Sequence, residues 1–84
     1  MKVTFHRTFK KQYKKLPRKV QLQFMERLSL FNDDPYSAVL NVHQLTGEMS
    51  GYISMNVNGD VRALFLRFEE EVVFERIGTH SSLY

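Results

Sequence analysis

The stretch Val61–Phe68, VRALFLRF, is nearly all apolar and is interrupted only by Arg62 and Arg67. A run of this kind is typical of a central strand with both faces buried. Residues 58–60, Asn-Gly-Asp, directly precede it, and Asn-Gly suits the positive φ values of a type I′ turn. The sequence therefore predicts a tight hairpin that leads into the central strand of a sheet.

Strand patterns lie on both sides of this run. Residues 53–57, ISMNV, alternate between apolar and polar side chains. Residues 72–77, VVFERI, follow three glutamates that mark another turn. At the start of the chain, residues 2–6, KVTFH, also alternate. These patterns predict one strand at the N-terminus and a β-meander in the second half.

Two helices are expected between the first strand and the meander. Their apolar positions recur at spacings of three and four: Phe9, Tyr13 and Leu16 in the first, Val20, Phe24, Leu28 and Phe31 in the second. Thr8 is the expected N-cap of the first helix. Pro17 suits the first turn of the second helix, which ends near residues 32–35 because Pro35 disfavours helical geometry before it.

The predicted order is β-α-α-β-β-β, an α+β fold in a single domain over residues 1–84. A helical hairpin covers one face of a small, mainly antiparallel sheet. Residues 36–51 form a loop with a short extended piece, in which Gly47 and Gly51 allow turns. No helix remains for the second face of the sheet, so we expect that face to be partly open and available for binding.

Charge is distributed unevenly along the chain. Residues 1–31 hold nine Lys or Arg and one acid, a net charge of +8, whereas residues 32–84 carry −5, giving +3 in total. A basic half beside an acidic half suggests a polyanion or an acidic partner on one side. The alternative is that the lysines of residues 10–19 simply solvate a helix surface.

Cysteine is absent, so disulfides and thiolate metal sites are excluded, and a reducing cytoplasm fits. No apolar run approaches the roughly 18 residues of a membrane span. The first residues, MKVTFHRTFKK, lack the apolar region of a signal peptide. We therefore expect a cytoplasmic protein that does not associate with a membrane.

Four polar residues are expected to meet at one end of the open face. His43 precedes the sheet, Asp60 lies in the hairpin turn, Arg62 begins the central strand and His80 follows the last strand. Such a set suits phosphodiester cleavage, in which one group takes a proton from a ribose 2′-OH, another protonates the leaving 5′-oxygen, and a cation stabilises the transition state. Tyr84 would stack on a base.

Plainer roles are available for the same residues. A histidine in a small domain is most often structural or merely exposed, and this holds for His6 in particular. Asp60 suits a turn, Arg62 suits a cross-strand ion pair, and Tyr84 suits packing on the sheet. The histidines do not show the spacing of a metal site, so no metal or other cofactor is expected.

Several motifs resemble the RelE/ParE superfamily of bacterial type II toxins, and most of all the YafQ-type endoribonucleases. They are His43-Gln-Leu-Thr-Gly47, the Gly51-Tyr52 pair, Asp60 before an apolar strand, and the ending FERIGTHSSLY at residues 74–84. The resemblance covers the whole chain. It implies a toxin that cuts mRNA on the ribosome without a cofactor and is neutralised by a cognate antitoxin protein, with which it forms a hetero-oligomer.

The resemblance also implies roles for single residues. His43, Asp60 and His80 match catalytic positions, and His80 is the implied general acid. Tyr84 matches a terminal aromatic that positions RNA, and Arg62 matches a strand arginine that contacts phosphate. Asn56 stands where YafQ-type toxins can carry another histidine; it can bind a phosphate or a 2′-OH but cannot carry a proton. Whether His43 or Asp60 is the base therefore stays open.

Two other functions stay open at this point. A ParE-like toxin that acts on DNA gyrase has the same fold but generally lacks the histidine and aspartate set. A catalytically weak or purely binding member would use the basic region of residues 10–19 on nucleic acid. Under the nuclease interpretation, the ending is expected to turn at Gly78 so that His80 faces the open side of the sheet, with Leu83 as a packing anchor.

Overall fold

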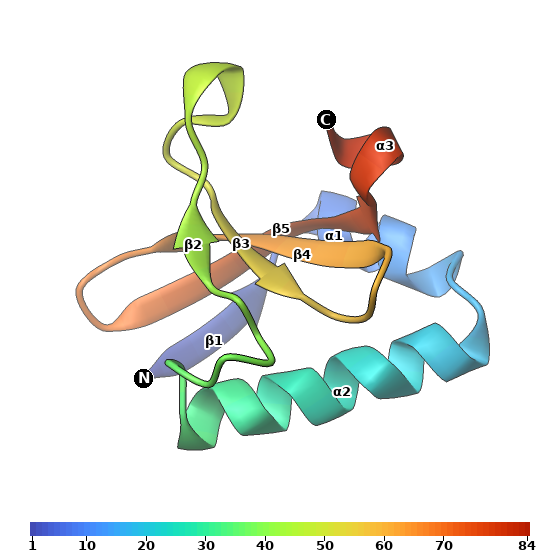
Figure 1. Cartoon of the computed structure of the whole chain (residues 1–84), viewed down its shortest axis with the longest axis horizontal. Coiled ribbons are helices and arrows are strands. Elements are labelled where there is room, and N and C mark those ends of the chain that lie inside the picture. The colour runs from blue at the N-terminus through green and yellow to red at the C-terminus, as the bar shows by residue number, and fades with distance from the viewer.

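The computed structural model describes residues 1–84 and shows a five-stranded sheet with the long helix α2 along one side (Figure 1). The elements are β1 (Lys2–Phe5), α1 (Arg7–Lys14), α2 (Arg18–Asp33), β2 (His43–Gln44), the 3₁₀ turn η1 (Gly47–Met49), β3 (Ile53–Asn56), β4 (Val61–Arg67), β5 (Glu71–Thr79) and α3 (His80–Leu83). The strands lie in the order β1-β5-β4-β3-β2, and only β1 and β5 run parallel. The predicted α+β fold and the central position of β4 are confirmed.

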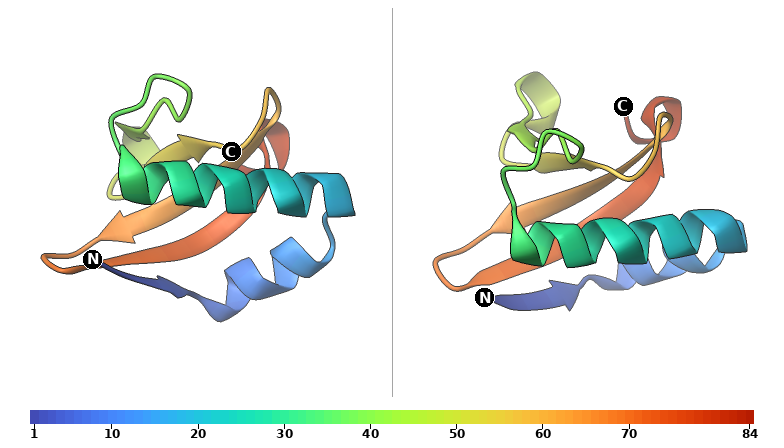
Figure 2. Two further views of the ribbon diagram at one scale, coloured as in Figure 1. Left: turned by 90° about the horizontal axis from the view of Figure 1, so that it is seen from below. Right: turned by 60° about the horizontal axis from the view of Figure 1, so that its bottom comes forward.

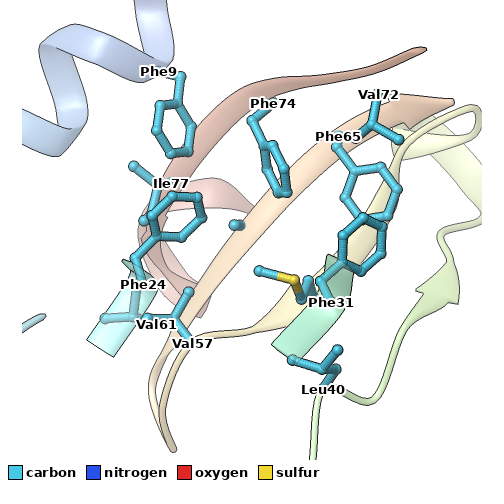
Figure 3. Close-up of a cluster of buried hydrophobic side chains, with 12 residues drawn as sticks. Phe9, Phe24, Phe31, Leu40, Val57, Val61, Phe65, Val72, Phe74 and Ile77 are labelled. Carbon is cyan, nitrogen blue, oxygen red and sulfur yellow. The ribbon is translucent and has the colours of Figure 1, made fainter. Parts of the chain in front are cut away.

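Both long helices pack on the same face of the sheet (Figure 2). Twelve buried residues form the core between them, and Figure 3 shows Phe9 and Phe24 of the helices facing Phe74 of β5. The rings of Phe24 and Phe74 meet edge to face with centroids 5.4 Å apart. Because so much aromatic surface is buried here, this face supplies most of the apolar stabilisation.

The N-cap of α1 differs from the prediction. Thr8 lies inside the helix, and His6 caps it instead, because His6 keeps an extended backbone and its Nδ1 accepts from the Thr8 amide at 3.1 Å. His6 therefore has a structural role, as expected of a histidine that matches no catalytic position. The end of α2 is confirmed at Asp33, two residues before Pro35.

The hairpin between β3 and β4 is not the predicted type I′ turn. Neither Asn58 nor Gly59 has a positive φ. The Asn58 side chain replaces that geometry, since its Oδ1 accepts from the amides of Asp60 at 2.8 Å and Val61 at 2.7 Å. This Asx-type arrangement holds the backbone of Asp60 in place.

The segment between α2 and β3 starts beside α2, and only its part around η1 rises above the sheet on the side away from α2 (Figure 1). Leu40 anchors it with no exposed surface, and Gly47 and Gly51 have φ values of 69° and 100°, which confirms both turns. No helix is both long enough and apolar enough to span a membrane.

The chain ends in the short helix α3, which the sequence did not predict. Thr79 caps it by accepting from the Ser82 amide at 3.2 Å, and Leu83 is buried, as expected of an anchor. Gly78 does not turn the chain: it lies within β5, paired with Arg62, and its φ is not positive. Its missing side chain instead makes room for α3, because a Cβ there would lie 2.7 Å from Ser82 Oγ.

Candidate active site on the open face

Two rows of paired residues cross the face of the sheet opposite the helices. One row is His43, Ser54, Leu64 and Arg76, and the other is Asn56, Arg62 and Gly78. Cross-strand partners in such rows project to the same face. Leu64 is fully buried yet lies outside the helix-side core, which shows that this face is covered in part.

The imidazole of His43 is exposed and its orientation is fixed from one side. Its Nδ1 lies 2.8 Å from the carbonyl oxygen of Asn41, and because a carbonyl only accepts, Nδ1 carries the proton. Asn41 adopts a φ of 45°, a left-handed conformation that asparagine tolerates. Nε2 of neutral His43 is therefore left as a free acceptor on the open face.

His80 and Asp60 are joined through their backbones. The amide of His80 donates to the carbonyl oxygen of Asp60 at 3.1 Å. Both side chains are exposed. No hydrogen bond links the side chains of His43, Asp60 and His80; strand pairing joins His80 to Asp60, and His43 lies on β2 at the far edge of the sheet.

Tyr84 connects the end of the chain to the first row. Its ring meets that of His80 edge-on, with centroids 4.5 Å apart, and its hydroxyl lies 3.4 Å from Ser54 Oγ. Ser54 is the cross-strand partner of His43 and has no exposed surface. Tyr84 itself stays 45% exposed, so part of the residue is available to a ligand.

Arg62 does not present its guanidinium freely. Its Nη1 donates to the carbonyls of Asn58 at 2.7 Å and Val61 at 3.2 Å, and its Nη2 donates to Gly59 at 3.4 Å. The side chain therefore bends back over the hairpin turn and braces it. The predicted phosphate contact would have to use the N–H groups that remain.

Asn56 carries the one buried side-chain polar atom without a partner. Its Oδ1 is enclosed and accepts no hydrogen bond. An unsatisfied buried acceptor costs about 1–3 kcal/mol. Asn56 pairs with Arg62 in the second row, so this oxygen belongs to the same face as the histidines.

Three further residues of this face were not assigned a role from the sequence. The pairing of β4 with β5 shifts register after Leu64, and this bulge places Glu75 between the paired residues Phe74 and Arg76. Tyr52 reaches across β4 and donates to Glu75 Oε1 at 3.0 Å. Burial, followed by this hydrogen bond, raises the pKa of Tyr52, and the nearby charge of Arg76 opposes the rise.

No group of three or more His, Cys, Asp or Glu side chains is arranged to hold a metal ion. The structure thus gathers His43, Asn56, Tyr84 and His80 on or beside one face, and it places Asp60 and Arg62 at the hairpin that borders it.

Solved structures with the same fold cover nearly the whole chain. A chain of the Escherichia coli DinJ–YafQ complex is 26% identical, with 98% of this chain and 96% of that chain covered and a TM-score of 0.72. A chain of the toxin–antitoxin complex RelBE2 from Mycobacterium tuberculosis is 24% identical, with 94% and 96% covered and a TM-score of 0.76. The solution structure of HP0894 from Helicobacter pylori is 21% identical, with 100% and 99% covered and a TM-score of 0.76. No curated protein matches in sequence.

The fold is therefore that of the RelE-like toxins, with helices on one face of the sheet and a polar site on the other. The family model described as the bacterial toxin of type II toxin–antitoxin system, YafQ, matches residues 1–84, and the chain belongs to that family.

Proposed function

We propose that this toxin is an endoribonuclease that cuts mRNA, on the ribosome, by general acid and base catalysis without a metal ion. The observation that supports this most is the line of groups from His43 through Ser54 and Tyr84 to His80. An exposed histidine stands at each end of this line, and the partly exposed Tyr84 links them. The proposed substrate places the protein in the cytoplasm.

The chemistry needs two proton transfers at one phosphodiester. A base takes the proton of the ribose 2′-OH, whose oxygen then attacks the adjacent phosphorus. As that O–P bond forms, the bond from phosphorus to the 5′-oxygen breaks, and an acid protonates the leaving oxygen. The products are a 2′,3′-cyclic phosphate and a 5′-hydroxyl, and no co-reactant is consumed.

The residues divide these tasks by what their atoms offer. Nε2 of neutral His43 is a free acceptor, which suits the base, and Asp60 is the alternative. We assign the role of general acid to His80, the first residue of α3. Asn56 is the proposed substrate contact beside Arg62; its Oδ1 is enclosed, so a donor such as the 2′-OH reaches it only when the groups that cover it move aside, and the hydrogen bond would then remove the cost of leaving it unsatisfied.

The test compares two histidine substitutions. His80→Ala should abolish growth arrest and lower message cleavage by about 10²–10⁴-fold, the typical contribution of one positioned acid or base. His6→Asn is the matched control: it also removes an imidazole, but asparagine keeps the N-cap of α1, so toxicity should persist. Full toxicity of His80→Ala, or intact message with gyrase-linked DNA breaks, would contradict the proposal.

A second comparison separates the candidate bases. His43→Asn keeps a side-chain amide near the Nδ1 position and so preserves a donor to Asn41, but it removes the Nε2 acceptor. We expect this variant to lose cleavage and retain the fold. If it cleaves normally while Asp60→Asn does not, Asp60 is the base and the assignment to His43 is wrong.

We also propose that the chain binds a cognate antitoxin through the helical hairpin. A groove of about 240 Å³ there is lined by Phe5, Phe9, Tyr13, Phe24 and Met25, with Lys10 and Lys14 at its border. Apolar lining with basic edges suits an amphipathic segment with acidic flanks. The DinJ–YafQ and RelBE2 structures are complexes of this general kind.

Charge placed in this groove should separate the toxin from its antitoxin. Met25→Glu should prevent co-purification with the product of the neighbouring gene, because Met25 lines the groove and is 52% exposed. Tyr36→Glu introduces the same charge at an 86% exposed residue outside the groove and should leave the complex intact. Equal binding by both variants would rule out this surface.

A further inference from the structure

The bulge in β5 changes which side chains reach the open face. Val72, Phe74 and Ile77 belong to the helix-side core, so strict alternation would point Arg76 into that core. The extra residue at the bulge resets the phase, and Arg76 pairs instead with Leu64. Bulges beside functional sites often redirect a side chain in this way.

The two arginines next to the site differ in what their guanidinium groups contact. Both Nη atoms of Arg62 donate hydrogen bonds to carbonyl oxygens of the hairpin turn. Arg76 is exposed and lies in the same row as His43 and Ser54. The guanidinium of Arg76 lies near the Tyr52 hydroxyl, but unlike that of Arg62 it is not bound to backbone carbonyls, so Arg76 is the cation of this face that a ligand can reach.

A hydrogen bond across the sheet supports the bulge. Tyr52 donates to the carboxylate of Glu75 at 3.0 Å, which ties the start of β3 to β5 over the top of β4. This bond directs Glu75 toward Tyr52 and fixes the backbone immediately before Arg76. The position of Arg76 on the open face is thus fixed by the hydrogen bond between Tyr52 and Glu75 and not by a loop.

We propose that Arg76 binds a backbone phosphate of the RNA that flanks the one being cut. The row from β2 to β5 crosses three inter-strand gaps, about 14 Å in all. Arg76 forms no hydrogen bond with either imidazole and lies four residues before His80 along β5, so we assign it as a positioning residue and not a catalytic one. This inference rests on the proposed endoribonuclease function.

Salt dependence of binding measures the contact directly. The probe is a mixed-sequence single-stranded RNA with every 2′-OH methylated, which blocks attack, bound to the full chain at several salt concentrations. Each phosphate contact on a single strand contributes a slope of about −0.7 to log K against log salt concentration. Arg76→Gln should reduce the slope by about 0.7 and weaken binding roughly fivefold at 0.1 M salt.

Two variants control for charge and for geometry. Arg67→Gln removes the same charge from an exposed residue whose partner, Val72, belongs to the helix-side core, so its slope should match the wild type. Arg76→Lys keeps the charge and should restore the slope. In message cleavage, Arg76→Gln should raise KM and leave kcat within about twofold.

The outcomes separate this inference from the function on which it rests. An unchanged slope for Arg76→Gln, with message cleavage intact in the wild type, overturns the role of Arg76 alone. If Arg76→Gln reduces the slope but the wild type cuts no message, the phosphate contact is supported and the proposed nuclease function is overturned. A fall in kcat without a change in KM would also contradict a positioning role.

Discussion

The amide of His80 donates to the carbonyl oxygen of Asp60 across 3.1 Å, one residue beyond the pairing of Val61 with Thr79. This bond extends the β4–β5 ladder to the edge of the site. It holds the two candidate catalytic residues next to each other without using either side chain. Each side chain is therefore free for chemistry, and each can be replaced without breaking the link.

Replacing Asp60 should separate chemistry from folding. Asp60→Ala keeps the carbonyl that receives the His80 amide, and the Asn58 side chain still fixes the turn. We expect a Tm within about 2 °C of the wild type, since exposed positions of this kind change stability little. Message cleavage, followed by primer extension, should fall. A large loss of Tm would show that the carboxylate is structural.

Tyr84 should act through its ring rather than its hydroxyl. The bond of 3.4 Å to Ser54 is long, whereas the ring lies exposed beside His80. Tyr84→Phe should keep near-normal binding of methylated RNA, and Tyr84→Ala should lose about 1–3 kcal/mol, the usual value for one base stacked on an aromatic side chain. Equal losses in the two variants would assign the effect to the hydroxyl.

Gly78 should be sensitive because α3 folds back onto it. An added Cβ would lie 2.7 Å from Ser82 Oγ, so Gly78→Ala must either turn that hydroxyl away, which breaks its bond to the Thr79 carbonyl oxygen, or shift the helix that carries His80. A misplacement near 1 Å costs about 10²-fold in rate. Adding Ser82→Ala removes the clashing oxygen and should restore most of the cleavage. If the double variant is no better than the single one, the close approach of α3 is not the cause.

Much of the fold follows from patterns in the sequence that are local. The apolar run of β4, the spacing of the helix positions and the stop before Pro35 each predict an element that the structure contains. Turn chemistry was harder to predict. Asn58-Gly59 has the composition of a type I′ turn, but the Asn58 side chain bonds to two following amides and stabilises a different turn.

The sequence indicates which face a residue lies near when that residue is at the end of a strand. It does not do so when the register of strand pairing decides the face. His43 begins β2 and His80 follows β5, so their place beside the sheet could be inferred from the order of the elements alone. Arg76 could not, because strict alternation assigns it to the core and only the bulge after Leu64 reverses that assignment. The short helix α3 was missed for a similar reason: it depends on Thr79 as a cap and on contact with Gly78.

The bond between Tyr52 and Glu75 should make stability fall at alkaline pH. Burial and this bond raise the pKa of Tyr52 above its ordinary value of about 10 in the folded chain. Between the unfolded and folded values, the unfolded chain has lost a proton that the folded chain keeps, so the free energy of unfolding decreases as pH rises. Urea denaturation from pH 8 to 11 should show this decrease in the wild type and a shallower one in Tyr52→Phe. Parallel curves for the two proteins would show that Tyr52 does not contribute.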